Sequence, residues 1–316
     1  MARDVPTIAA VMVRTFAPLA LSTLLVIVVA ACGGNPGPEP SPVGQASPTT
    51  APSPTTAPSP SANPSPSPRV IPHVFLIVME NTALARALAS PPIARLASAN
   101  TLLTNYYAVA RPSLPNYLAM TSGSTWGIAD NDYHVLPAAD LGTQLTTAGI
   151  SWKAYMEGLT DAGCMRSPYP YALKHNPFAY YGGKCPPNVV PLTALAADLA
   201  SDTPHFVWIK PGLCNDGHDC SLDVAGAWLE NTVSRIVASS VWRPTSVMFV
   251  VWEEGDGGDN NLVPLIVVTP DGTPGRSETR YDHYSLLATI EDLYGLPRLG
   301  AAATARPLTP LIASGR

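Results

Sequence analysis

Four short apolar runs constrain the fold of this chain more than any other feature of its sequence. They span residues 74–79, 205–209, 247–252 and 264–269, and they do not alternate between apolar and polar residues. Strands buried on both faces need such runs, which are typical of parallel sheets. Helical patterns occupy residues 223–239 and 284–294. We therefore predict an α/β sandwich with a largely parallel central sheet flanked by helices.

Polar clusters follow three of these runs. Glu80 and Asn81 end the first run, Glu253 and Glu254 end the third, and the second leads into a segment that contains Asp216. Each cluster alone is equally consistent with ordinary turn chemistry. Because ligands bind beyond the carboxyl ends of strands in such sheets, we expect the clusters to meet at one edge. Carboxylates gathered there repel one another without a cation, so the sequence predicts a divalent metal or phosphate site.

The segment "RPSLPNYLAM" places Ser113 just before a predicted helix that starts near Leu114. Two interpretations remain open. Ser113 caps the helix, which is a common and sufficient role for a serine. Alternatively, it is a nucleophile at a helix N-terminus that attracts anions, with Asn116 nearby.

The N-terminal region has the layout of a secretory signal. Arg3 and Arg14 precede or begin an apolar run that ends in small residues at Cys32, as in a bacterial lipoprotein signal whose cysteine is lipidated. An uncleaved membrane anchor is the alternative, but the run is shorter than the roughly 20 residues that span a bilayer. We expect a signal peptide at residues 1–31, lipidation of Cys32 and a location on the extracytoplasmic face of the cell membrane.

Composition divides the rest of the chain. Residues 32–68 are rich in Pro, Ser and Thr and lack apolar side chains to bury, which predicts a disordered linker. Residues 69–316 have the length of one catalytic domain. The net charge of -5, without a basic cluster, argues against nucleic-acid binding. We expect a monomer that contacts the membrane only through its anchor.

The remaining four cysteines suggest two disulfides, because the chain is predicted to be exported. Three pairings are possible, and proximity favours Cys164 with Cys185 and Cys214 with Cys220. A zinc site is the alternative, but no Cys-x-x-Cys spacing supports it.

Seven segments in order resemble the bacterial phosphoesterase family, which contains acid phosphatases and phospholipases C and belongs to the alkaline-phosphatase-like superfamily. They are "VFLIVMEN" (74–81), "RPSLPNYLAMTSG" (111–123), "SWKAYME" (151–157), "KHNPF" (174–178), "LCNDGHDC" (213–220), "VVWEEGDG" (250–257) and "YDHYSLLATIEDLYGLP" (281–297). The resemblance implies an alkaline-phosphatase-like sandwich and a phosphoric ester hydrolase.

The resemblance also implies roles for individual residues. Ser113 is the expected nucleophile, and a divalent metal ion is the expected cofactor. The expected metal ligands are Glu80, Asn81, Ser113, Glu253, Glu254 and Asp216. Asn116, Lys174 and His175 are expected to contact the substrate, while His218 and His283, near Asp219, are candidates for acid–base catalysis.

Two features depart from the family pattern. Glu253 stands where the family usually has Asp, and Asn260 and Asn261 follow where a His is common. His73 and His205, which lie before or within predicted strands, are expected to be structural.

We therefore expect an extracytoplasmic phosphoesterase that acts on small phosphate esters, most readily as an acid phosphatase-like phosphomonoesterase. A phospholipase C-like phosphodiesterase and a catalytically inactive surface binding protein are the alternatives. A serine esterase or a P-loop protein is disfavoured because neither Gly-x-Ser-x-Gly nor a P-loop motif occurs.

Overall fold

A computed structural model describes residues 72–257, 260–272 and 274–312 of the chain. The predicted signal peptide, the proposed lipidation site Cys32 and the predicted linker at residues 32–68 lie outside the described residues. Within the described part, none of the helices is both long and apolar enough to cross a membrane.

The described residues form one nine-stranded sheet with the order β4-β3-β5-β1-β6-β7-β2-β8, in which β9 also pairs with β2. All neighbouring strands are parallel except that β7 runs antiparallel to both β6 and β2. The strands are β1 (Val74–Met79), β2 (Thr101–Tyr107), β3 (Trp152–Met156), β4 (Val189–Pro191), β5 (Phe206–Lys210), β6 (Val247–Trp252), β7 (Leu262–Val268), β8 (Gly275–Ser277) and β9 (Tyr281–Asp282).

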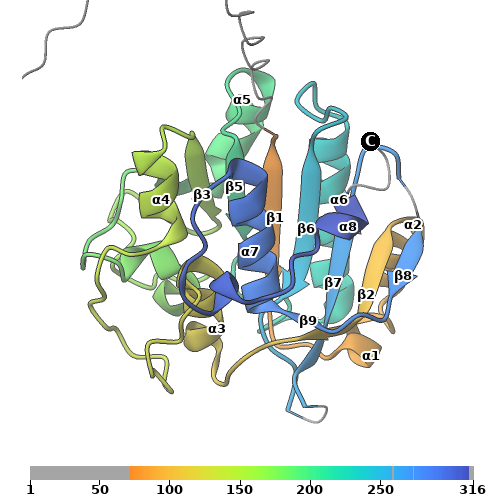
Figure 1. Cartoon of the computed structure of the whole chain (residues 1–316), viewed down its shortest axis with the longest axis horizontal. Coiled ribbons are helices and arrows are strands. Elements are labelled where there is room, and N and C mark those ends of the chain that lie inside the picture. The colour runs from red at the N-terminus through yellow and green to blue at the C-terminus, as the bar shows by residue number, and fades with distance from the viewer. Residues whose placement is uncertain (1–71, 258–259, 273, 313–316) are drawn as a thin grey trace, which may run out of the picture. The chain divides into compact units, whose positions relative to one another are not determined.

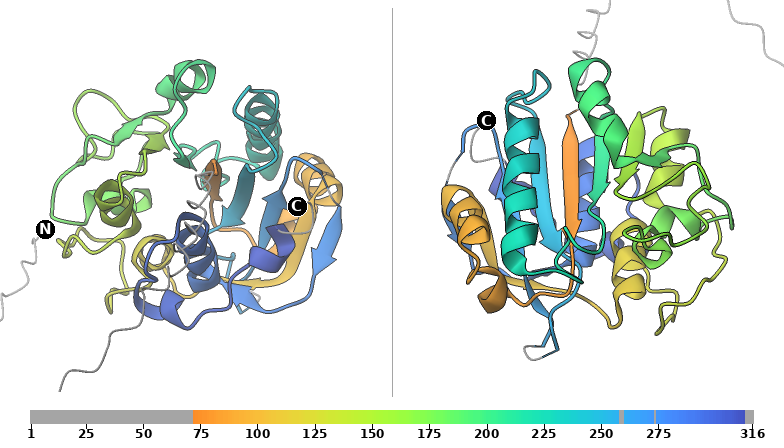
Figure 2. Two further views of the ribbon diagram at one scale, coloured as in Figure 1. Left: turned by 45° about the horizontal axis from the view of Figure 1, so that its top comes forward. Right: turned by 180° about the vertical axis from the view of Figure 1, so that it is seen from behind.

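Helices cover both faces of the sheet. Figure 1 looks onto the face covered by α7, while the view from behind in Figure 2 shows α2, α5 and α6 over the opposite face. The α-helices are α1 (Leu84–Ala87), α2 (Pro91–Ala99), α3 (Ser113–Ser122), α4 (Leu141–Thr147), α5 (Leu195–Ala200), α6 (Leu222–Val237), α7 (His283–Tyr294) and α8 (Thr309–Ile312). Four 3-10 turns are η1 (Leu173–His175), η2 (Pro177–Ala179), η3 (Leu192–Ala194) and η4 (Gly300–Ala303). The predicted α/β sandwich with a largely parallel sheet is confirmed.

Strand β1 lies at the centre of the sheet, and every one of its side chains is buried. It pairs in parallel with β5 on one side and β6 on the other, so the carboxyl ends of these three strands meet. Met79 is the register partner of Trp252, which brings the residues after β1 beside those after β6. The rings of His73 and His205 stack at the amino ends of β1 and β5, with ring centres 4.9 Å apart.

Both expected disulfides are present. Cys164 is bonded to Cys185, and Cys214 is bonded to Cys220. The second bond closes a seven-residue segment that carries Asp216 and His218, so it restrains the loop between β5 and α6.

Candidate active site

Ser113 is the first residue of α3, and its side chain does not cap the helix. The N-cap position belongs to Pro112, whose side chain makes no cap hydrogen bond. The Ser113 hydroxyl instead donates toward Glu254 Oε1 at 3.2 Å and lies 3.5 Å from Glu80 Oε2. The interpretation of Ser113 as a simple helix cap is therefore wrong.

Three glutamates and an asparagine lie together near Ser113 because they follow the paired ends of β1 and β6. Glu80 and Glu253 are fully buried, and Glu254 is only 5% exposed. The backbone N–H of Asn81 donates to Glu253 Oε2 at 3.0 Å. Its side-chain amide, turned so that the nitrogen donates, lies 3.0 Å from Glu80 Oε2. Glu80 and Glu254 thus approach the Ser113 hydroxyl, and Asn81 connects Glu80 with Glu253.

Crowding of these carboxyls disturbs their ionisation. Burial raises the pKa of Glu253 well above its ordinary value, and the nearby charges of Glu80 and Glu254 raise it further. Burial likewise raises the pKa of Glu254. Burial would also raise the pKa of Glu80, but its interactions with His175 and with the Lys210 ammonium outweigh burial and hold that pKa well below the ordinary value. In the absence of a cation, burial therefore favours the protonated forms of Glu253 and Glu254, and their ionisation requires a nearby positive charge.

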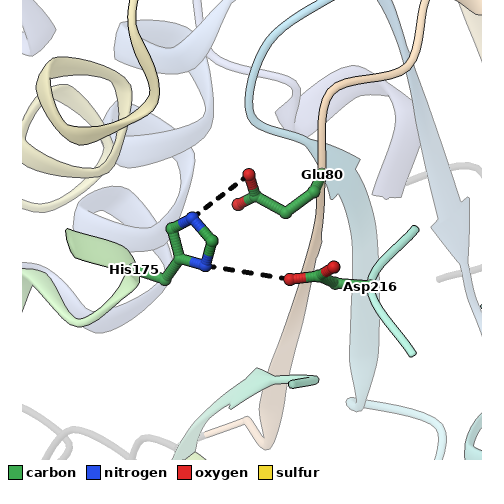
Figure 3. A group of neighbouring side chains, drawn as sticks. All are labelled: Glu80, His175 and Asp216. Carbon is green, nitrogen blue, oxygen red and sulfur yellow. Dashed lines mark ion pairs between the residues drawn. The ribbon is translucent and has the colours of Figure 1, made fainter. Parts of the chain in front are cut away.

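A second group lies on the other side of Glu80 (Figure 3). The His175 ring lies between two carboxylates, with Nε2 3.2 Å from Glu80 Oε2 and Nδ1 3.8 Å from Asp216 Oδ2. Nε2 is buried, and its approach to Glu80 lacks the geometry of a hydrogen bond. Burial lowers the pKa of His175 to about 4, so this ring is neutral near neutral pH. Burial raises the pKa of Asp216 to about 6.

Two residues of this group were not anticipated from the sequence. The Lys210 ammonium, at the end of β5, pairs with Asp216 Oδ2 and lies 3.4 Å from Glu80 Oε1. The Tyr117 hydroxyl donates a short hydrogen bond to Glu80 Oε1. Tyr117 lies four residues after Ser113, one helical turn on, and that spacing was the available signal for it. A lysine that ends an apolar strand gives no comparable signal, because lysines are rarely buried.

His218 and Lys174 lie at the margin of the site. The His218 backbone N–H donates to Asp216 Oδ1 at 2.8 Å, and its Nδ1 lies 2.6 Å from Asp219 Oδ1. Its side chain is 30% exposed, and its ring centre lies 6.1 Å from that of His175. Lys174 is half-buried on η1, directly before His175. Both side chains are therefore partly open to solvent beside the buried group.

Asn116 differs from its expected role as a substrate contact. Its Oδ1 accepts hydrogen bonds from the backbone N–H groups of Val109 and Ala110, at 3.0 and 2.9 Å. Its Nδ2 donates to the carbonyls of Ala110 and Pro112. All four hydrogen-bonding positions of the amide are thus used by the loop before Ser113. Asn116 holds that loop in place and leaves nothing free for a phosphoryl group.

His283 also differs from its expected catalytic role. It is fully buried at the start of α7, with Nδ1 2.9 Å from the Tyr106 hydroxyl and Nε2 2.6 Å from the Glu253 carbonyl. Burial lowers the pKa of His283 to about 4. Because both ring nitrogens are engaged and the ring is neutral, His283 positions the backbone of Glu253 and does not protonate a leaving group.

Asn261 joins the two loops that meet at Ser113, in the region where the family often has a histidine. Its Oδ1 accepts from the backbone N–H of Gly255, and its Nδ2 donates to the Ala110 carbonyl at 2.8 Å. Asn260 and Asn261 both have positive φ, which asparagine tolerates better than most residues. This pair therefore has a structural role in holding the loop after β6.

Two sets of side chains have the chemistry to hold a divalent cation. Glu80, His175 and Asp216 offer ligand atoms that lie within 4.8 Å of one another. Lys210 already balances much of the charge of that set, because its ammonium contacts both carboxylates. The set around Ser113 consists of Glu80, Asn81, Glu253 and Glu254. Among the described residues, no buried ammonium contacts Glu253 or Glu254. Hard oxygen donors with uncompensated charge fit a divalent cation.

Comparison with known proteins identifies relatives of this chain. A model of the phosphoesterase family matches residues 86–297. The chain is 31% identical to a phosphate-repressible acid phosphatase of Penicillium chrysogenum, over 71% of this chain and 59% of that protein. It is 32% identical to a phosphatidylinositol-3-phosphatase of Mycobacterium tuberculosis, over 76% of this chain and 82% of that protein. The matched region thus spans less than two thirds of the fungal relative and most of the mycobacterial one.

The fold has solved counterparts. A protein of the alkaline phosphatase superfamily from Vibrio parahaemolyticus superimposes with a TM-score of 0.53 at 11% identity, covering 72% of this chain and 67% of that chain. At this identity the likeness concerns the arrangement of the sheet and helices alone.

Proposed function

Because this chain belongs to the phosphoesterase family, we propose that it hydrolyses phosphate esters through Ser113, acting mainly as an acid phosphatase-like phosphomonoesterase. The observation that carries the proposal is the position of the Ser113 hydroxyl. It lies at the head of α3, free of any capping role, and 3.2 Å from Glu254 Oε1 within a buried acidic cluster.

Three side chains carry out the attack and the proton transfers. Ser113 Oγ attacks phosphorus, and its proton passes to Glu254, whose carboxylate accepts the hydroxyl's hydrogen bond. The bond to the ester oxygen breaks, and the alkoxide takes a proton from His218, which is half-exposed and paired with Asp219. Water then attacks the phosphoserine and gives a proton to His218, phosphate is released, and Ser113 regains its proton from Glu254.

A divalent metal ion fits this site, and we propose that Glu80, Asn81, Ser113, Glu253 and Glu254 hold it. When bound, such an ion lowers the pKa of the serine hydroxyl and offsets negative charge on the phosphoryl oxygens. Tyr117, Lys210 and His175 fix the orientation of Glu80, since all three approach its carboxylate. Asp216 is better explained as the partner of Lys210 than as a ligand.

The names of the relatives, acid phosphatase and phosphatidylinositol-3-phosphatase, favour monoester over diester hydrolysis. A phospholipase C-like phosphodiesterase remains the second candidate because the family includes such enzymes. The intact set of buried acidic groups argues against an inactive binding protein, since carboxyls crowded to this extent destabilise a fold that has no use for them.

A substrate screen tests the proposal. The purified protein should hydrolyse p-nitrophenyl phosphate faster than p-nitrophenyl phosphorylcholine, and activity should depend on an added divalent metal after chelation. Faster cleavage of the phosphorylcholine ester would support the phosphodiesterase. A protein that cleaves neither ester with any of Mg²⁺, Mn²⁺, Ca²⁺ or Zn²⁺ would contradict the proposal.

We propose further that the enzyme is a lipoprotein on the extracytoplasmic face of the cell membrane. The sequence around Cys32 supports this location, and the two disulfides are consistent with an oxidising compartment.

A further inference from the structure

Arg111 lies beside the acidic cluster, two residues before the proposed nucleophile. Its Nη1 donates to the Gly255 carbonyl at 2.7 Å and lies 3.6 Å from Glu254 Oε2. The other oxygen of the same carboxylate accepts from Ser113 at 3.2 Å. The Glu254 carboxylate therefore lies between the Ser113 hydroxyl and the Arg111 guanidinium. A phosphoryl group bound to Ser113 would lie within reach of this guanidinium.

The side chain of Arg111 also remains open to solvent on one side. It is 40% exposed, whereas the Glu254 side chain is 6% exposed. Among the described residues, Gly255 provides the only hydrogen-bond acceptor for its five N–H donors. The remaining donors are available to a ligand that enters the site, and their fork geometry matches two oxygens of a phosphoryl group.

The negative charge of the acidic cluster makes a cation at the position of Arg111 important for binding a phosphate dianion. Four carboxyls lie in the buried site, those of Glu80, Asp216, Glu253 and Glu254, and the buried Lys210 ammonium contacts the first two of them. When all four carboxyls are ionised around a bound divalent ion, the ion and Lys210 together carry less positive charge than the carboxylates carry negative charge. A phosphate dianion thus needs further cations at the entrance, where Arg111 and Lys174 stand.

We propose that Arg111 binds the second negative charge of a phosphomonoester and thereby makes this site select monoesters over diesters. This inference rests on the proposed phosphatase function and names the group that defines its substrate class. A monoester carries close to two negative charges above about pH 6, whereas a diester carries one and has a substituent in place of the second charged oxygen. A guanidinium held beside the phosphoryl group therefore stabilises the bound monoester more than the bound diester.

Two substrates with the same leaving group test the inference: p-nitrophenyl phosphate and its methyl ester, methyl p-nitrophenyl phosphate. At about pH 7.5, Arg111→Gln should lower kcat/KM for the monoester by roughly 10- to 100-fold, mainly through KM, and for the diester by less than about threefold. Inhibition by inorganic phosphate should weaken in parallel. Arg111→Lys should recover part of the loss, because it restores the charge without the fork.

Arg86→Gln is the matched control. Arg86 is exposed and pairs at 3.4 Å with Asp256, in the same loop as Gly255 but outside the acidic cluster. This variant removes the same charge from the same region, and its kinetics should resemble those of the wild type with both substrates. Bound metal, measured by elemental analysis, should be unchanged in the Arg111 variants, which excludes loss of the cation as the cause.

Titration of the substrate supplies a second readout. At about pH 5 the monoester also carries one negative charge, so the selective loss in Arg111→Gln should shrink. Equal loss for both esters, no loss, or a selective loss of the same size at both pH values would overturn the inference. If the wild type does not turn over the diester, its inhibition constant against the monoester replaces kcat/KM. A wild type inactive on both esters would instead contradict the proposed function itself.

Discussion

At the scale of single residues, the N-terminus of α3 assigns two tasks to different side chains: stabilisation of the helix start and the proposed nucleophilic attack. The Leu114 backbone N–H, a donor of the kind that N-cap side chains accept from, donates to Asn131 Oδ1 at 3.1 Å. Asn116 fixes the loop on the other side of Ser113 through its four hydrogen bonds. Because these two asparagines supply the local stability, the Ser113 hydroxyl is directed entirely toward the carboxylates.

This arrangement gives the first prediction, which concerns Ser113→Ala. The free energy of unfolding of the variant should lie within about 1 kcal/mol of the wild-type value, because Ser113 makes no cap hydrogen bond. Its turnover of p-nitrophenyl phosphate should fall by several orders of magnitude, since the attacking atom is lost. Wild-type enzyme quenched in acid during turnover should carry one phosphate on Ser113, measured by mass spectrometry of peptides.

Ser98→Ala is a control for this experiment. Ser98 is an exposed residue of α2 whose hydroxyl donates a hydrogen bond to the Arg95 carbonyl within the same helix, so its loss should leave both stability and turnover nearly unchanged. Near wild-type turnover by Ser113→Ala would remove the proposed nucleophile from the mechanism.

The site was only partly predictable from single residues. Glu80, Ser113, Glu253 and Glu254 were accessible because each follows a recognisable strand or begins a helix. Lys210 was not, because its burial depends on Asp216 and Glu80, which approach it from a loop and from another strand. The hydrogen-bond contacts of Asn116 and His283, which differ from those that their expected roles require, were beyond prediction for a related reason. Their hydrogen-bond partners, including Val109 and Tyr106, become visible only when the chain is folded.

At the scale of elements, strands with unbroken apolar runs were predicted well. The bounds of β1 and β6 coincide with the predicted runs, and β5 differs by one residue at each end. Strand β2 was missed because "TLLTNYY" mixes buried and half-buried positions. The antiparallel direction of β7 was also beyond prediction, since direction depends on how the chain returns to the sheet and not on the composition of the strand.

Helix α7 carries a buried acid far from the catalytic chemistry. Its N-terminus has a capping box formed by Asp282 and Ser285. Near its other end, Glu291 is fully buried, and its Oε1 accepts the Leu299 backbone N–H at 2.8 Å. Oε2 has no hydrogen-bond partner among the residues that the structure describes. Burial raises the pKa of Glu291 to about 8.

The second prediction is a pH dependence of stability that arises from Glu291. The folded chain holds this proton up to about pH 8, whereas an unfolded glutamate loses it near about pH 4.3. The stability that the group contributes is therefore complete below about pH 4.3 and is lost as the pH rises toward 8. Glu291→Gln keeps the Oε1 acceptor without the titration, so its advantage in melting temperature over the wild type should grow from pH 5 to pH 8.

Glu278→Gln is the control for this titration. Glu278 is exposed in the segment between β8 and β9, so its replacement should shift the melting temperature by a similar small amount at both pH values. A Glu291→Gln variant that parallels the wild type across this pH range would show that Glu291 ionises in the folded chain without cost.

At the scale of the whole molecule, the predicted anchor decides where the enzyme meets its substrate. Cys32→Ala should prevent lipidation, so the protein should be released or should retain its signal peptide. Partitioning into detergent and the mass of the mature N-terminus measure the outcome. A wild-type protein whose N-terminus carries no lipid would contradict the lipoprotein assignment.

The acidic cluster also affects the stability of the entire domain. Glu253 lies at the end of a central strand, and its pKa is raised by burial and by the charges of Glu80 and Glu254. Without a cation, ionisation of this group opposes folding. With a cation, the same charges contribute to binding, and the free energy of binding adds to the stability of the folded state.

The last prediction tests the metal site by comparing melting temperatures with and without the cation. Chelation should lower the melting temperature of the wild type by several degrees, and the metal should restore it. Glu253→Gln removes one repelling charge and one ligand together. At about pH 8 it should therefore melt above the wild type when both are metal-free, and it should gain less than the wild type when metal is added. Glu230→Gln, which alters an exposed pair with Arg95, should follow the wild type in both states. If chelation leaves the wild-type melting temperature unchanged and elemental analysis finds no metal in the active protein, the cation does not belong to this cluster, and the Ser113 hydroxyl must be activated by Glu254 alone.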